Sequence, residues 1–306
     1  MKKKYDIIGD IHGYADELEQ LLIKLGYNND SGYYSHPDRR AIFVGDFIDR
    51  GPKIRETLII AKSMVEKGSA LAIMGNHEYN ALCYHTLGTD GKPLREHSKK
   101  NTEQHEATIE QFEKHQEEWI SYLDWFRELP LFLELEGLRV VHACWDSENI
   151  NVIPPRLKFT TKFLLKLHSK NHFKKSPLYI AIDECLKGRE HKMPGGASFQ
   201  DNKGVIRDEV RIKWYKNPRI CNYEDYYMED IPELKGKKVD VKSLKKDYFY
   251  DEAIPVICGH YWFSGKPEIE SRKVACVDYS IAKEGKLVAY RWNGDGILNN
   301  EGFICV

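Results

Sequence analysis

Short apolar runs that lead into glycine and polar residues are the main pattern of this chain of 306 residues. Three of these runs, at residues 5–8, 41–44 and 70–74, lie near the start of the sequence. Their length and β-branched content are typical of buried strands in a largely parallel sheet. Two similar runs occupy residues 138–141 and 255–258. We therefore predict an α/β fold whose strands carry polar residues at their carboxyl ends.

The residues that follow these runs are of the types that bind divalent metal ions. The first three runs lead into the segments GDIHG, GDFIDRG and GNHE, and the last two lead into histidines. Open α/β sheets bind ligands at the carboxyl ends of their strands, so we expect these side chains to converge. Oxygen and imidazole donors of this kind suit a pair of divalent ions beside an anion. The candidate ligands are Asp10, His12, Asp46, Asn76, His142 and His260.

In this order, the motifs resemble those of the calcineurin-like metallophosphoesterases. More narrowly, they are similar to the phosphoprotein-phosphatase type, which includes serine/threonine phosphatases and symmetrical diadenosine tetraphosphatases. The motifs lie between residues 5 and 145 and between residues 255 and 292. The resemblance implies two mixed β-sheets flanked by helices. Residues 274–279 and 286–292 would then be two strands that close the second sheet.

The resemblance also implies a role for each motif residue. Asp10, His12 and Asp46 would hold a first ion, and Asp46 would bridge to a second. Three further residues would complete the coordination of the second ion: Asn76, His142 and His260. Manganese is the favoured metal, with iron, zinc, nickel or magnesium as alternatives. The implied reaction is attack on phosphorus by a hydroxide that bridges the two ions.

Three residues would act on the substrate itself. His77 would be the general acid that protonates the leaving oxygen, and Asp49 would keep its imidazole in orientation. Arg50 would bind the phosphoryl oxygens with its planar guanidinium. Glu78 is expected either to support the site residues without binding a metal itself or to start a helix.

Two insertions separate the motifs. Residues 98–128 are charged, with apolar positions at helical intervals, which predicts a pair of helices packed on the sheet. Three histidines lie in this segment or directly before it: His97, His105 and His115. Their spacing is not that of two ligands on one helical face. We expect no metal role for them.

The second insertion is predicted to be a cap embedded in a single domain of 306 residues. The core would comprise residues 1–146 and 252–306, and the cap residues 147–251 would shape the substrate pocket. The candidates for assisting Arg50 are Lys187, Arg207 and Arg211, and exposed ion pairs are the alternative for each. Trp145 either lines the pocket, where it could stack on a base, or packs in the core.

Composition fits a cytoplasmic protein. Lys and Arg total 46 and Asp and Glu total 47, so net charge gives no attraction to nucleic acid or membrane surfaces. No apolar stretch approaches a membrane span, and the start lacks a signal-peptide core. Seven cysteines include no C-x-x-C pair, which indicates free thiols in a reducing compartment.

Three functions fit the sequence. The first is hydrolysis of a phosphate ester or anhydride of a small nucleotide, with diadenosine tetraphosphate as the favoured substrate. The second is a serine/threonine or tyrosine phosphoprotein phosphatase with the same metal chemistry. The third, a metal-binding regulatory protein without catalysis, is disfavoured by the intact Asp49, Arg50 and His77.

Overall fold

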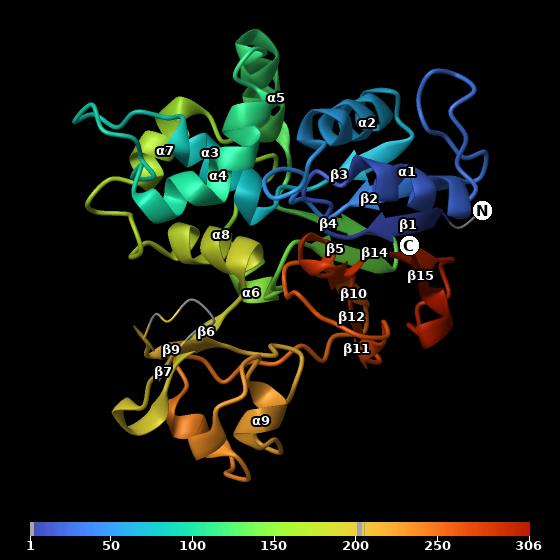
Figure 1. Cartoon of the computed structure of the whole chain (residues 1–306). Helices are drawn as coiled ribbons and strands as arrows, with labels where there is room; N and C mark the ends of the chain where they lie inside the picture. Colours follow the sequence, from blue (N-terminus) through green and yellow to red (C-terminus); the bar gives the residue numbers. More distant parts are fainter. Residues whose placement is uncertain (1–2, 201–203, 205) are drawn as a thin grey trace.

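Two β-sheets pack face to face, with helices on their outer sides, in the computed structural model of the chain (Figure 1). The structure describes residues 3–200, 204 and 206–306. Side chains from both sheets meet in one apolar cluster, which includes Ile7 and Ile42 of the first sheet and Val140 and Ile257 of the second. The predicted α/β sandwich of two mixed sheets is confirmed.

The first sheet is built around the three strands that the sequence predicted near the start. Its order is β13-β14-β1-β2-β3, with β15 also paired to β14. Strands β1, β2 and β3 are parallel to one another, whereas β14 is antiparallel to β1. The bounds are β1 (Lys4–Ile8), β2 (Arg39–Phe43), β3 (Ala70–Ala72), β13 (Asp278–Tyr279), β14 (Lys286–Trp292) and β15 (Phe303–Cys305).

The second sheet has the order β11-β12-β10-β5-β4. Strand β10 is parallel to both β5 and β12, which brings the ends of two predicted strands to one edge. The bounds are β4 (Phe132–Leu135), β5 (Leu138–Val141), β10 (Val256–Cys258), β11 (Ile269–Ser271) and β12 (Val274–Cys276).

The two strands expected to close the second sheet divide between the sheets instead. Strand β12 lies in the second sheet, but β13 and β14 both belong to the first. The chain therefore changes sheet at Val277, whose N–H still bonds to Cys258 in the second sheet. The reason is that residues 289–292 of β14 pair with β1, which places β1 between β14 and β2 in the first sheet.

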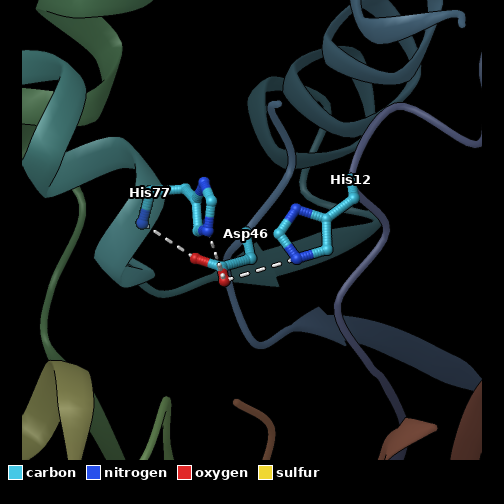
Figure 2. Close-up of side chains that lie close together, drawn as sticks. All are labelled: His12, Asp46 and His77. Carbon is cyan, nitrogen blue, oxygen red and sulfur yellow. Dashed lines mark hydrogen bonds and ion pairs between the residues drawn. The ribbon is translucent and has the colours of Figure 1, made fainter. Parts of the chain in front are cut away.

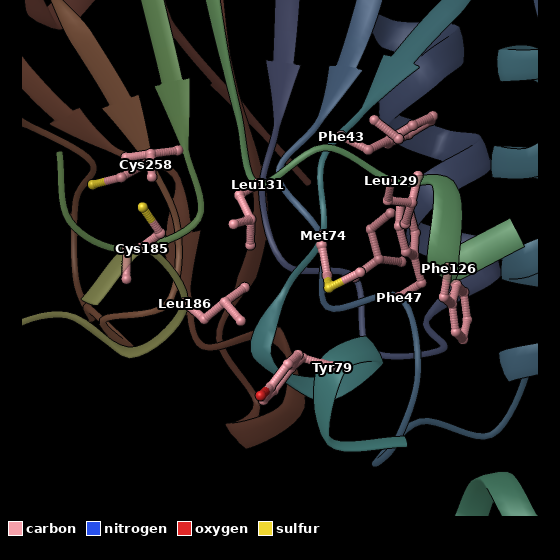
Figure 3. Close-up of a cluster of buried hydrophobic side chains, with 14 of the residues drawn as sticks. Phe43, Phe47, Met74, Tyr79, Phe126, Leu129, Leu131, Cys185, Leu186 and Cys258 are labelled. Carbon is pink, nitrogen blue, oxygen red and sulfur yellow. The ribbon is translucent and has the colours of Figure 1, made fainter. Parts of the chain in front are cut away.

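The central strands are largely apolar because both of their faces are covered. In β1, Tyr5 and Ile7 face the other sheet, and Ile8 packs on the helical side. This explains the continuous apolar runs of the sequence. On the helical side, Phe43, Phe47 and neighbouring side chains form a large cluster (Figure 3).

Helices cover the outer face of the first sheet and surround the motif loops. Residues 98–128 form two helices, as predicted, and Ser98 caps the first by accepting a hydrogen bond from the Asn101 N–H. The bounds are α1 (Ala15–Lys24), α2 (Ile54–Glu66), α3 (Asn76–Tyr84), α4 (Lys99–Gln111) and α5 (Gln116–Glu128). No helix of the described residues is long and apolar enough to cross a bilayer.

The insertion from residue 147 onward has two differently packed parts. Helices α7 (Thr161–Leu167) and α8 (Pro177–Lys187) contribute to the main apolar cluster. The following part has an apolar cluster of its own and extends as a lobe beside the sandwich (Figure 1). The remaining elements are α6 (Ser147–Ile150), β6 (Glu190–Lys192), β7 (Phe199–Gln200), β8 (Ile206–Arg207), β9 (Glu209–Arg211) and α9 (Tyr223–Tyr226).

Asp146 joins the core to both parts of this insertion. Its buried carboxylate accepts hydrogen bonds from Arg189 Nη2 and Lys246 Nζ, each at 2.5 Å, and from the Glu148 N–H at 3.0 Å. Burial raises the pKa of Asp146, but these cations outweigh burial and hold the pKa below its ordinary value. The ionised carboxylate therefore stabilises the fold.

We expect Asp146→Asn to lower the free energy of unfolding by about 3 kcal/mol, because removing one partner of a buried ion pair leaves its cations poorly compensated. Since the pKa of Asp146 is depressed, its contribution is present at neutral pH and lost as pH falls below about 4. Urea unfolding at pH 7 and pH 3 measures both effects. Asp124→Asn, which alters an exposed carboxylate that pairs with Arg127, is the matched control. Equal effects of the two substitutions would contradict the prediction.

Candidate metal centre

Asp46 lies at the centre of the predicted site, where the loops that follow the parallel strands meet. Its Oδ2 is 3.6 Å from His12 Nε2 and 3.9 Å from His77 Nε2 (Figure 2). Its Oδ1 is 3.5 Å from His142 Nε2 and accepts a hydrogen bond from the His77 N–H at 3.0 Å. That N–H belongs to the first turn of α3, whose positive end favours a carboxylate.

Two groups of side chains in this site could each hold a metal ion. One comprises His12, Asp46 and His77, and the other comprises Asp46, His142 and His260. Within each group the potential ligand atoms lie within 4.8 Å of one another. Asp46 belongs to both groups, which is the arrangement that a dinuclear centre with a bridging carboxylate requires.

Asp10 and Asn76 lie beside these groups. Asp10 Oδ2 accepts a hydrogen bond from the His260 N–H at 3.0 Å. Asn76 Oδ1 lies 3.0 Å from His142 Nε2 and 2.8 Å from His260 Nδ1. All six candidate ligands therefore gather at one place, although His77 stands in the first group where the resemblance put Asp10.

Unpaired polar atoms support the presence of cations. Asp10 Oδ1, His12 Nε2 and His260 Nε2 are buried and have no hydrogen-bond partner among the described residues. A buried polar atom without a partner costs about 1–3 kcal/mol, so native proteins rarely leave several together. Each of these atoms has a lone pair that a metal ion can accept. The residues therefore fit the divalent ions that the sequence predicted.

Electrostatics favour the same conclusion. Burial and the neighbouring His77 lower the pKa of His12 to about 4, so its imidazole is neutral and available as a ligand at pH 7. Burial, Asp278 and Asp46 together raise the pKa of Asp10 well above its ordinary value. Burial also raises the pKa of Asp46, but the surrounding imidazoles outweigh it and lower the pKa. Bound cations would relieve the repulsion between the buried carboxylates.

The backbone of the site adopts a conformation that side chains usually avoid. Five of the predicted site residues have positive φ: His12 (51°), Asp46 (51°), Asp49 (68°), Arg50 (76°) and His260 (75°). Such residues persist only where surrounding contacts hold them, and they concentrate at functional sites. Close packing adds a further constraint, since a Cβ on Gly75 would lie 2.2 Å from Asp46 Oδ1.

Residues behind the site orient the ligands. His12 Nδ1 bonds to the Ile48 carbonyl at 2.9 Å and His142 Nδ1 to the Val44 carbonyl at 2.7 Å, which turns both Nε2 atoms inward. Glu78 accepts hydrogen bonds from the N–H groups of Asp46 and Phe47, each at 2.8 Å. Burial and the charge of Asp46 raise the pKa of Glu78 to about 7. Glu78 thus has the supporting position that the sequence suggested.

The predicted acid and its partner are in contact. His77 Nδ1 lies 2.5 Å from Asp49 Oδ2. Burial lowers the pKa of His77, but Asp46 and Asp49 outweigh burial, so the pKa is raised. Its Nε2 faces Asp46, as Figure 2 shows. The imidazole can therefore hold a proton beside the metal groups.

Helix α4 supplies residues that the sequence analysis missed. His105 Nδ1 and Thr108 Oγ1 bind Asp49 Oδ1 at 2.8 and 2.7 Å, and Gln104 Nε2 lies 3.5 Å from His77 Nε2. The signal in the sequence was a set of polar residues at positions i, i+1 and i+4 of one helix. None of His97, His105 and His115 joins a metal group among the described residues.

The remaining candidates from the sequence lie at the surface, in the core or in the cap. Arg50 is exposed, with its guanidinium 5.6 Å above the ring of Trp262, which in turn lies 5.5 Å from the His12 ring. Trp145 is a buried core residue whose Nε1 donates to Ser147. Of the cap candidates, Lys187 pairs with Asp183.

Arg211 and Arg207 lie in the lobe. The positive charge of Arg211 contributes, after burial, to lowering the pKa of His260 well below its ordinary value. Arg207 lines a groove of about 690 Å³ together with Arg211 and several acidic residues.

The site agrees with a known family. The sequence profile of the calcineurin-like phosphoesterases matches residues 3–241 of this chain. The chain belongs to the calcineurin-like phosphoesterases. Its strand-end motifs had indicated this family.

Individual relatives match shorter parts of this phosphoesterase. An asymmetrical bis(5'-nucleosyl)-tetraphosphatase from Oceanobacillus iheyensis is 36% identical over 141 residues, which is 46% of this chain and 55% of that protein. Its counterpart from Halalkalibacterium halodurans is 49% identical over 75 residues, or 24% and 30% of the two chains. The chain thus spans about half the length of these curated relatives or less.

Solved structures show the same fold. A cold-active protein tyrosine phosphatase is 17% identical, with a TM-score of 0.50 over 99% of this chain and 80% of that chain. A serine/threonine phosphatase from Saccharomyces cerevisiae is 14% identical, with a TM-score of 0.50 over 99% and 79%. At these identities the likeness concerns the fold alone.

We expect manganese to raise the thermal midpoint of chelator-treated protein, because an ion that binds only the folded state adds about 2.7 kcal/mol at a hundred times its Kd. Asp46→Asn should lose most of this shift, since the carboxylate is common to both groups. Asp16→Asn, which alters an exposed pair with Lys53, is the control and should keep it. Scanning fluorimetry measures the thermal midpoints. A full manganese-induced shift in Asp46→Asn would contradict the role of this carboxylate in both metal groups.

Proposed function

We propose that this phosphoesterase hydrolyses a phosphate anhydride or ester of a small nucleotide at a dinuclear centre formed around Asp46. The observation that carries the proposal is the position of the His77–Asp49 pair beside that carboxylate. A protein that only binds metal has no need of an acid held by a buried partner. The ligands would be Asp10, His12, Asp46, Asn76, His142 and His260.

The chain's own residues have distinct tasks in this proposal. Arg50 binds the phosphoryl oxygens with a planar pair of N–H donors. His77 delivers a proton from Nε2 to the leaving oxygen, and Asp49 accepts a hydrogen bond from Nδ1 and stabilises the protonated ring. Ions bound at the two groups would supply Lewis acidity and lower the pKa of water. Arg211 is the cap residue best supported as a second cation near the phosphate, because its charge acts on His260.

The nucleotide proposal is supported by the names of two relatives and by one aromatic side chain beside the site. The relatives from Halalkalibacterium halodurans and Oceanobacillus iheyensis carry the name of asymmetrical bis(5'-nucleosyl)-tetraphosphatases. Trp262 offers an aromatic surface beside His12 and Arg50, and aromatic surfaces of this kind stack on bases. Manganese remains the favoured ion.

The substrate prediction is tested with manganese-loaded protein on diadenosine tetraphosphate and, in parallel, on a mixed set of phosphopeptides. We expect breakdown of the dinucleotide with peptides barely changed, measured by chromatography. ATP with AMP would indicate asymmetrical cleavage, and ADP alone symmetrical cleavage. Rapid peptide dephosphorylation with intact dinucleotide would instead identify a phosphoprotein phosphatase.

His77→Asn should lower kcat by about 10²–10⁴-fold, because it removes the proton donor. The bound metal, measured by elemental analysis, should stay the same. His115→Asn, a substitution outside the site, is the matched control. Wild-type turnover by His77→Asn would remove this residue from the mechanism.

Arg50→Ala should reduce kcat/KM by about 10²-fold or more, because a donor aimed at developing charge is lost. Arg55→Ala removes a neighbouring arginine that pairs with Glu118 and serves as the control. Unchanged kinetics in Arg50→Ala would exclude it from phosphate binding.

A further inference from the structure

Asp49 is held from behind by helix α4. Its Oδ1 accepts hydrogen bonds from Thr108 Oγ1 at 2.7 Å and His105 Nδ1 at 2.8 Å. The Thr108 hydroxyl also accepts a hydrogen bond from the Asp49 N–H at 3.1 Å. Thr108 and His105 are both buried, so water does not compete for these bonds. The carboxylate is fixed in one orientation, with Oδ2 left for His77.

The neighbours of His105 define its protonation. The Trp119 indole N–H, which can only donate, lies 3.3 Å from His85 Nε2. His85 Nε2 is therefore an acceptor, and the hydrogen shared with His105 Nε2, 3.1 Å away, belongs to His105. Burial and the charge of His105 lower the pKa of His85 to about 4, in agreement with a neutral ring.

His105 therefore carries a hydrogen on both nitrogens, since the carboxylate of Asp49 can only accept. The resulting imidazolium and Asp49 form a buried ion pair that is separate from the contact with His77. A fixed cation on one oxygen keeps Asp49 ionised and oriented toward His77. Helix α4 reaches the same loop again through Gln111, which donates to the Gly51 carbonyl and accepts from the Ile54 N–H.

We propose that α4 positions the general acid of this enzyme, with His105 and Thr108 as positioning residues that act through Asp49. This inference rests on the proposed function, because it gives His77 the role of acid. Neither residue touches the metal groups. Their loss should therefore affect proton delivery to the leaving group and leave substrate binding unchanged.

The test compares two probes that differ in their need for a proton. Phenyl phosphate releases a basic phenolate, whereas 4-nitrophenyl phosphate releases a stabilised anion. Thr108→Val keeps the volume but removes the hydroxyl, and we expect kcat on phenyl phosphate to fall about tenfold, as for other supporting residues. The loss on 4-nitrophenyl phosphate should be much smaller, with KM unchanged on both probes.

Two variants on the same helix complete the design. Thr108→Ser restores the hydroxyl and should recover turnover of phenyl phosphate. Thr102→Val removes a hydroxyl that bonds to Tyr84 instead of Asp49 and should leave both rates unchanged. Equal losses on both probes in Thr108→Val, or no recovery in Thr108→Ser, would overturn the proposal.

A spectroscopic measurement separates this inference from the proposed function. Nitrogen-15 NMR of wild-type protein at pH 7 should show both ring nitrogens of His105 protonated, with Nδ1 altered in Thr108→Val. One unprotonated nitrogen would overturn the ion pair. If wild-type protein hydrolysed neither diadenosine tetraphosphate nor the aryl phosphates, the proposed function would fail, and the NMR result would still decide the protonation of His105.

Discussion

The buried carboxylate of Asp46 is the constraint on which the rest of the site depends. It is 1% exposed, and burial of a carboxylate is costly unless cations or N–H donors compensate its charge. The N–H of His77 and its imidazole, whose pKa is raised, supply part of this compensation, and the rings of His12 and His142 lie beside the carboxylate. Their convergence requires parallel strands that end together, a left-handed backbone at Asp46 and a glycine at position 75.

A second buried carboxylate shows how the protein compensates such a charge with its own cations alone. Asp6 is fully buried, and its oxygens bind Arg39 at 2.8 Å and Arg291 at 2.9 Å. Asp10, four residues later, has no such cation, and its Oδ1 has no partner among the described residues. The strand and the loop that follows it thus hold one carboxylate that the protein compensates and one that an external cation would compensate. This contrast is the physical argument for metal at the strand end.

The sequence predicted which candidate ligands gather at the strand ends, because the information for this is local. Strands buried on both faces give continuous apolar runs, and each ligand lies within a few residues of a strand end. Helix α4 was predicted as a helix, but its contact with Asp49 joins residues 56 and 59 positions apart. Such a contact depends on how the helix packs, which periodicity does not encode. The change of sheet at Val277 was missed for the same reason, because β13 and β14 are placed by pairing with β1.

The position of α4 links two parts of the proposed chemistry. Asp49, Arg50 and Gly51 form one tight loop with positive φ at its first two residues, so they cannot shift independently. Helix α4 binds this loop before and after Arg50, through Thr108 at Asp49 and Gln111 at Gly51. The orientation of the proposed acid and the placement of the guanidinium proposed to bind phosphate are therefore held by the same helix. Differences in α4 between members of the family would then alter leaving-group protonation and phosphate binding together, without any change to the metal ligands.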